Sequence, residues 1–280
     1  MGTSQSSKGP GGGVPLVPPW VPDLNSPTPP EPPDGQDSPE SPPAAELSVS
    51  PTPLARAGRF SAARRSFGSF AHSGDSRDMQ RGLGHYTRNG YGGAGIASRR
   101  LSRTSATAAM FNRVLEGLSR GSGASGGDVP LDARLFAGKS ADEVMNAVVE
   151  AVRSIDGSLD AEASRAAILD GLSELFTRFP DADLLNLTDE QRAFAVERYA
   201  SNDVFRRIQL DIGKTIHDKS PTAAVALARL KQIRDYVKET VAASFRKLRD
   251  SGSSLTAGNI ERIVRDAIRD TFGVFEGFAE

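Results

Sequence analysis

Residues 220–250 read SPTAAVALARLKQIRDYVKETVAASFRKLRD, and this stretch decides the fold class. Its larger apolar side chains recur every three or four positions, the spacing that places side chains on one face of an α-helix. These side chains are Leu230, Ile233, Val237, Val241, Phe245 and Leu248. Ser220 is suited to cap the helix, and Pro221 fits its first turn, where an N–H is not needed. The stretch therefore predicts one amphipathic helix, the longest in the chain.

The same helical spacing continues through most of the chain after residue 104. Capping-box patterns at Ser140–Glu143 and Thr188–Gln191 predict two helix starts, and Pro180 predicts a helix end. Ser201–Asp203 can cap a new helix, so we expect two separate helices on either side of it. The expected helices lie at about 105–119, 140–155, 160–179, 188–200, 201–216 and 220–250, with a last one from about 257. No alternating apolar and polar pattern typical of strands is present. The sequence thus predicts an all-α domain of six or seven helices over residues 104–280.

Charge and proline divide the chain before that domain. Fifteen of the 18 prolines lie at or before Pro53. Residues 1–55 carry one Lys and six acidic residues, for a net charge of −5, whereas residues 56–103 carry ten Arg and two Asp, for +8. Residues 104–280 carry 23 basic and 27 acidic residues, for −4, so the overall charge of −1 conceals a strong segregation. These shifts in composition predict domain boundaries near residues 24, 56 and 104.

Residues 24–55 are rich in Pro, Ser, Glu and Asp and contain few large apolar side chains. Such a segment cannot offset about 1–2 kcal/mol of backbone entropy per ordered residue, so we expect an acidic, Pro-rich disordered spacer. A Pro-x-x-Pro ligand for a recognition domain is the functional alternative. The predicted fold is therefore an all-α domain preceded by a long disordered Pro-rich and Arg/Gly-rich N-terminal region.

Residues 56–103 combine Arg with Gly, Ser and aromatic residues. Arginine can bind phosphates and aromatic rings can stack on bases, so a nucleic-acid-binding arm is one hypothesis. Its phosphate-binding residues would be Arg64, Arg65, Arg99 and Arg100. Its aromatic residues are Phe60, Phe67, Phe70, Tyr86 and Tyr91. The preferred interpretation is a basic linker without apolar periodicity, which folds partly against an acidic partner or against the chain's own helical domain.

The sequence offers little catalytic chemistry. It contains no Cys, which excludes disulfides and thiolate sites, and no His-Glu-x-x-His pattern or Asp-rich calcium loop. The only histidines are His72, His85 and His217. His217 lies at an expected helix end, where the helix dipole favours a solvated histidine, and this interpretation is simpler than a catalytic base. We therefore expect no enzymatic activity, no metal and no cofactor. The absence of a long apolar run or a secretory signal predicts a cytoplasmic protein without a membrane span.

The first 23 residues read MGTSQSSKGPGGGVPLVPPWVPD. They pass from small, hydroxyl-rich residues through a glycine run into an apolar segment that holds the only tryptophan, Trp20. This tail resembles the start of QatB, a component of the four-gene Qat anti-phage defence systems.

That resemblance implies partners and a role for the tail. Qat systems contain an ATPase, a TatD-like DNase and QatC, an enzyme similar to QueC, which makes a 7-deazaguanine precursor. The resemblance implies that the QueC-like enzyme modifies or clips the tail. A glycine-rich tail suits a narrow active site, because no Cβ obstructs the backbone. The candidate modified residues are Gly2, Gly9, Gly11, Gly12 and Gly13. The candidate partner-binding residues are Val14, Pro15, Leu16, Val17, Pro18, Pro19 and Trp20.

Two other uses of the tail stay open. Gly2 followed by Ser6 fits the myristoylation pattern, which would make the chain a lipid-anchored scaffold, although the acidic residues that follow disfavour membrane binding. The tail can also fold back onto the helical domain through Trp20. A nucleic-acid-binding adaptor that uses the basic segment is the third functional alternative.

Overall fold

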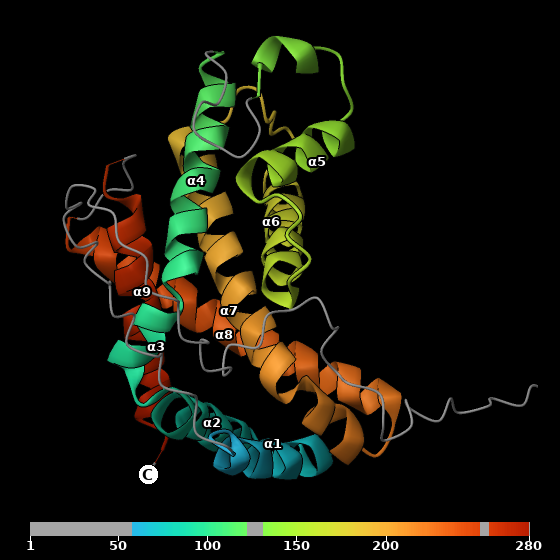
Figure 1. Cartoon of the computed structure of the whole chain (residues 1–280), viewed down its shortest axis with the longest axis vertical. Helices are drawn as coiled ribbons and strands as arrows, with labels where there is room; N and C mark the ends of the chain where they lie inside the picture. Colours follow the sequence, from blue (N-terminus) through green and yellow to red (C-terminus); the bar gives the residue numbers. More distant parts are fainter. Residues whose placement is uncertain (1–57, 122–130, 253–257, 280) are drawn as a thin grey trace, which may run out of the picture. The chain divides into compact units, whose positions relative to one another are not determined.

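A computed structural model describes residues 58–121, 131–252 and 258–279, and these residues are almost entirely helical (Figure 1). The chain divides into Met1–Pro53 and Leu54–Glu280, and every described residue lies in the second unit. The elements in chain order are α1 (Ser61–Ser73), α2 (Ser76–His85), the π-helical η1 (Tyr86–Tyr91), α3 (Ala94–Arg100), α4 (Ser102–Ser119), the 3₁₀-helical η2 (Ala133–Phe136), α5 (Ala141–Val152), α6 (Leu159–Arg178), α7 (Asp189–Lys219), α8 (Ala223–Asp250) and α9 (Ile260–Glu276). The predicted all-α class is confirmed. The tail 1–23 and the spacer 24–55 lie outside the described residues.

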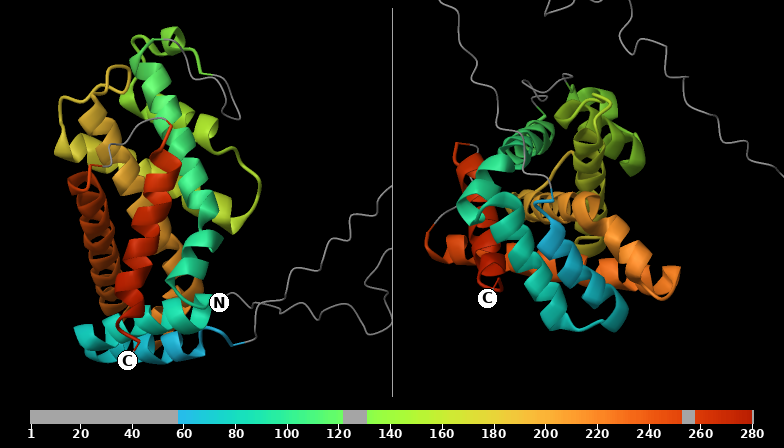
Figure 2. Two further views of the ribbon diagram at one scale, coloured as in Figure 1. Left: turned by 90° about the vertical axis from the view of Figure 1, so that its left-hand side faces the viewer. Right: turned by 60° about the horizontal axis from the view of Figure 1, so that its bottom comes forward.

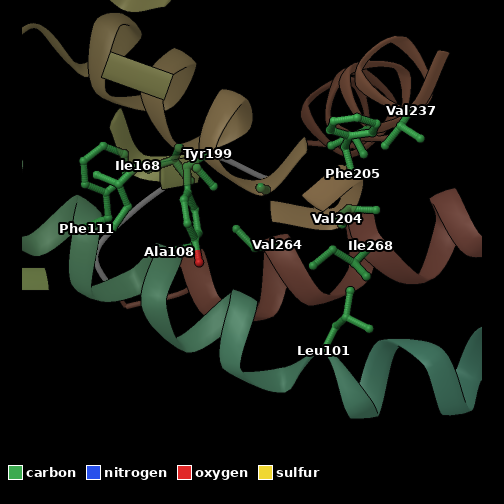
Figure 3. Packing of buried hydrophobic residues seen from close by; sticks show 14 of the residues in the cluster. Leu101, Ala108, Phe111, Ile168, Tyr199, Val204, Phe205, Val237, Val264 and Ile268 are labelled. Atoms are coloured by element: carbon green, nitrogen blue, oxygen red, sulfur yellow. The ribbon is translucent and has the colours of Figure 1, made fainter. Parts of the chain in front are cut away.

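The long helix α7 is the centre of the helical domain. It packs against α6, α8, α1 and α4, while α9 packs against α8, α4 and α3. Apolar side chains of α4, α6 and α7 meet in the core, where Phe111, Ile168 and Tyr199 have no solvent exposure (Figure 3). Helices α1 and α2 lie side by side across one end of the long helices, the same end at which the chain finishes (Figure 2).

Local capping chemistry sets most of the predicted helix starts. The Ser140 hydroxyl accepts from the Glu143 N–H, and the Glu143 carboxylate accepts from the Ser140 N–H, which completes the expected capping box of α5. Thr188 and Gln191 form the second box at the start of α7. The predicted cap of α8 is displaced by two residues, because Thr222 rather than Ser220 accepts from the Val225 N–H, at 3.2 Å.

The predicted break at Ser201–Asp203 is wrong, because α7 is continuous from Asp189 to Lys219. These three polar residues are buried within the helical domain, and each makes a side-chain hydrogen bond there instead of capping a new helix. The Ser201 hydroxyl donates to the Glu197 carbonyl at 3.0 Å, Asn202 donates to the Glu174 carboxylate at 3.1 Å, and Asp203 Oδ2 accepts from the Thr104 hydroxyl at 2.6 Å. For Asn202 and Asp203, partners from α6 and α4 therefore outweigh the local capping preference, while Ser201 bonds back to its own helix.

The prediction of an irregular, disordered segment before residue 104 is wrong for residues 58–103, which form α1, α2, η1 and α3 and enter the core. Phe67 and Phe70 of α1 are at most 1% exposed. The glycines of this segment permit close packing. A Cβ at Gly82 would lie 2.9 Å from the Phe67 ring, and one at Gly84 would lie 2.5 Å from the Ala279 backbone nitrogen. Of the two alternatives for this segment, folding against the chain's own helical domain is the one observed, and the domain includes residue 58 onward.

Candidate functional site

Three arginines, from the turn before α1, from α1 and from α3, lie next to one aromatic ring or one partly buried acidic residue. The Arg59 guanidinium carbon, before α1, lies 5.7 Å from the ring centroid of Tyr91, and that of Arg100, at the end of α3, lies 6.0 Å from the same centroid. Arg64 of α1 donates to the backbone carbonyl of Asp211 in α7, at 3.1 Å. We refer to Arg59, Arg64 and Arg100 as the arginine cluster.

Tyr86 and Asp211 form a hydrogen-bonded pair next to the arginine cluster. The Tyr86 hydroxyl donates to Asp211 Oδ2 at 2.8 Å and lies 3.4 Å from the Tyr91 hydroxyl. Burial raises the pKa of Tyr86 well above its ordinary value, so this phenol stays a neutral donor. Burial also raises the pKa of the Asp211 carboxyl, while the Tyr86 hydrogen bond and the charges of Arg59 and Arg64 oppose the rise. The Asp211 carboxylate therefore accepts a hydrogen bond from Tyr86, and no guanidinium group of the arginine cluster lies within 4.0 Å of its oxygens.

The rings around the arginine cluster pack on one another. Phe60 stacks on Tyr86 with centroids 5.1 Å apart, and Tyr91 meets the edges of Phe60 and Tyr86 at 5.8 and 5.2 Å. Tyr91 also contacts Phe272 of α9, at 6.2 Å. Phe60 and Tyr86 are at most 6% exposed. The hypothesis that the aromatic residues of the basic segment stack on bases is therefore wrong for the four that are buried, Phe60, Phe67, Phe70 and Tyr86, and Tyr91 is already surrounded.

The basic segment is poor in ion pairs. Of the nine arginines between residues 58 and 103, only Arg81 lies within 4.0 Å of a carboxylate oxygen of a described residue, Asp78. By contrast, arginines of the later helices commonly have such a partner, as Arg207 does in Asp203 and Asp160. The positive charge of α1, η1 and α3 is therefore largely uncompensated by direct pairing.

The structure separates the four arginines that the sequence pattern indicated. Arg64 and Arg100 belong to the arginine cluster, whereas Arg65 and Arg99 are exposed neighbours that make no contact with Tyr91 or Asp211. Sequence reasoning missed Arg59. Its position directly before Phe60 was the available signal, since its guanidinium lies 4.6 Å from the centre of that ring.

A groove between α8 and α9 is the second feature of the surface. It has a volume of about 720 Å³ and is lined by small or polar residues such as Thr240, Ala243, Ser244 and Gly273, with Tyr236 at one side. Lys247 and Asp270 form an ion pair of 2.8 Å within its lining. Mixed charge and small side chains give this groove no preference for one ligand class.

The acidic residues and histidines of the described residues are not gathered into a metal-binding group. No group of three or more His, Asp or Glu side chains is placed to share a metal ion within residues 58–121, 131–252 and 258–279. His217 lies on an exposed turn of α7, His72 is exposed, and His85 is paired with the Asn89 side chain at 3.2 Å. In the same part of the chain, every helix is too short or too polar to cross a membrane.

The chain matches the model of a family described as Qat anti-phage system associated protein QatB, over residues 92–275. No curated protein and no solved structure matches it. The match covers more than half of the chain and extends from the turn before α3 nearly to the end of α9. It rests on the helical domain, whereas the resemblance in the sequence rested on residues 1–23, so two separate parts of the chain indicate the same family. Membership implies that other components of the Qat anti-phage system are partners of this protein. The chain therefore belongs to the QatB family of Qat anti-phage system associated proteins.

Proposed function

We propose that this protein is a non-enzymatic component of the defence complex that presents its N-terminal tail to the QueC-like enzyme QatC, which clips or modifies it. The observation that carries the proposal is the sequence of residues 1–23, where glycines at 2, 9 and 11–13 precede an apolar Pro/Val/Leu/Trp segment. The helical domain that follows would hold the substrate tail within the complex. The chemistry would belong to the partner.

The two halves of the tail fit different tasks. Glycine lacks a Cβ, so a glycine-rich strand can enter a narrow active site with its amine or peptide bond accessible. Val14–Trp20 supplies apolar area, and Trp20 is the type of side chain that anchors protein interfaces. Pro15, Pro18 and Pro19 restrict the unbound backbone, which lowers the entropy lost on binding.

Gly2 is the first candidate acceptor, because removal of Met1 would expose its amine. Gly9 and Gly11–Gly13 become candidates if the tail is clipped first. We expect the intact mass after co-expression with the partners to exceed that of the protein expressed alone, or to correspond to a shortened tail with an adduct. The altered peptide should begin at a glycine.

Variants of the tail identify the acceptor. Replacing Gly2 with Leu should abolish the mass change if Gly2 is modified, whereas loss only on replacing one of Gly9 or Gly11–Gly13 would place the acceptor within a clipped tail. Identical masses with and without an active partner would refute the modification. A mass increase equal to a myristoyl group would favour the lipid anchor instead.

Docking is tested separately by co-purification with the QueC-like enzyme. Deletion of residues 2–23 should abolish recovery, while deletion of 24–45, a segment of the same length, should preserve it. Both deletions end before Leu54, where the helical unit begins. Equal recovery of the two deletion variants would show that the tail is not the docking element.

A further inference from the structure

The net positive charge of the helical domain comes from the segment that forms α1, α2, η1 and α3. Residues 58–103 carry nine Arg and two Asp, and their helices α1 and α2 cross the ends of the long helices (Figure 2). Within this segment Arg59 and Arg100 lie over the Tyr91 ring and Arg64 contacts the Asp211 carbonyl, and none of the three guanidinium groups has a carboxylate oxygen of a described residue within 4.0 Å. Uncompensated arginines from the turn before α1, from α1 and from α3 form a site for an anion.

We propose that the arginine cluster binds the phosphate backbone of nucleic acid and does so without reading base sequence. This inference is independent of the proposed function, because it concerns the helical domain rather than the tail. A guanidinium offers planar, forked donors that match two phosphate oxygens, and it keeps its charge at any physiological pH.

The Tyr91 ring prepares two of these arginines for binding. The guanidinium carbons of Arg59 and Arg100 lie over this ring, at 5.7 and 6.0 Å from its centroid. A cation–π contact of this kind restrains a long side chain, which lowers the entropy lost when it binds an anion. The two guanidinium carbons can be no more than about 12 Å apart, so both can contact neighbouring phosphates of one nucleic acid strand, whose charges are closely spaced.

The packing of the rings indicates that the backbone, and not the bases, is recognised. Proteins that hold single strands or read loops place exposed aromatic rings against the bases. Here Phe60 and Tyr86 are buried, and Tyr91 is flanked by Phe60, Tyr86 and Phe272. Phosphate contacts are therefore available at this surface, whereas base stacking is not. An acidic protein segment shares the negative charge, but it lacks the dense, regular charge of a phosphodiester strand.

The test is binding of the full chain to fluorescein-labelled 20-bp duplexes of two unrelated sequences, by fluorescence anisotropy at 50–200 mM salt. We expect equal affinity for both sequences and a linear decrease of log K with log salt. Replacing Arg59, Arg64 or Arg100 singly with Gln should each reduce the salt slope by about 0.9 and weaken binding several-fold, because each arginine neutralises about one phosphate. Conversion of each to Lys, which keeps the charge, should retain most of the slope.

Arg134→Gln is the matched control. Arg134 is an exposed arginine on η2, which packs on α4, and its guanidinium has no carboxylate oxygen of a described residue within 4.0 Å; only its backbone N–H donates to Asp132. It should bind duplex as the unmodified chain does. Circular dichroism of all variants checks that the helical domain is folded.

Five outcomes would overturn the proposal. The first is no binding at 50 mM salt, and the second is equal binding by the cluster variants and Arg134→Gln. The third is displacement of the duplex by polyglutamate of equal total charge as effectively as by unlabelled duplex, and the fourth is much tighter binding to single strands than to duplex. The third would identify an acidic protein as the partner, and the fourth would require base stacking. ATP or inorganic phosphate at millimolar concentration should compete only weakly, because neither carries the dense, regular charge of a phosphodiester strand. The fifth outcome, complete displacement of the duplex by either, would assign the cluster to a small phosphate ligand.

Discussion

Phe67→Ala tests whether the Arg/Gly-rich segment belongs to the core of the helical domain. The Phe67 side chain has no solvent exposure and lies between α1 and α2 against Gly82. Removing a buried phenyl ring costs about 3–5 kcal/mol, since the surroundings collapse only in part. A stability of about 5–15 kcal/mol is typical of a domain, so the variant should remain folded but much weakened.

The assay is urea unfolding followed by circular dichroism, with thermal unfolding as a second measure. For a domain of about 150–250 residues, each kcal/mol lowers Tm by about 2–4 °C, so a decrease of about 6–20 °C is expected. Arg65→Ala is the control, because Arg65 is an exposed residue of the same helix and should change stability by no more than about 0.5 kcal/mol. If Phe67→Ala unfolds like Arg65→Ala, the packing of α1 described above is incorrect.

A double-mutant cycle with Gly82→Ala sharpens the test. A Cβ at Gly82 would meet three atoms of the Phe67 ring at 2.9–3.0 Å and no nearer group. Gly82→Ala alone should therefore destabilise by about 1–3 kcal/mol through overpacking. In the Phe67→Ala background the ring is gone, and the better helix propensity of Ala should make the same substitution neutral or stabilising. Additive effects of the two substitutions would contradict the contact between them.

Two further predictions concern buried carboxylates of α7. Thr104→Val removes the hydroxyl that donates to Asp203 at 2.6 Å. Asp203 is fully buried and its Oδ1 has no hydrogen-bond partner among the described residues, so the substitution should lower the free energy of unfolding in urea by at least about 1–3 kcal/mol. An unchanged midpoint would mean that another group satisfies Asp203. Burial raises the pKa of Glu197 despite the nearby charges of Arg198 and Arg249. The folded state therefore holds this proton more tightly than the unfolded chain does. As pH rises above the ordinary carboxyl pKa of 4.5, the folded state loses stability relative to the unfolded chain. Glu197→Gln should therefore gain stability relative to the unmodified chain between pH 4 and pH 7, and a pH-independent difference between the two would refute this assignment.

The sequence was sufficient for helices whose signals are local. The capping boxes at Ser140 and Thr188 and the apolar stripe of α8 depend on residues within a few positions of each other, and the structure confirms them. It was insufficient where distant groups decide the outcome. Ser201–Asp203 has the composition of a helix cap, but Asn202 and Asp203 bond to partners in α6 and α4, and α7 runs through them unbroken.

The prediction of an irregular basic segment is wrong because its glycines, which are typical of loops, lie here in helices at close contacts. Gly82 and Gly84 are required by a ring of α1 and by the backbone after α9, and neither neighbour is apparent from local sequence. The arginine cluster depends on tertiary structure in the same way. Composition indicated Arg64 and Arg100, but Asp211, which orients Arg64, lies 147 positions away in the chain.

The boundary of the family match and the boundary of the fold differ, and the difference matters for the arginine cluster. The match begins at residue 92, whereas Phe60, Phe67 and Tyr86 of the preceding elements are buried in the same core as α9. A fragment trimmed to residues 92–275 would lose Arg59 and Arg64, and it would also lose Tyr91, the ring that contacts Phe272 of α9. Loss of anion binding in that fragment would then reflect both missing arginines and a damaged core. Point substitutions in the full chain separate these causes, because each removes one guanidinium and leaves the packing of α1 and α2 on the long helices in place.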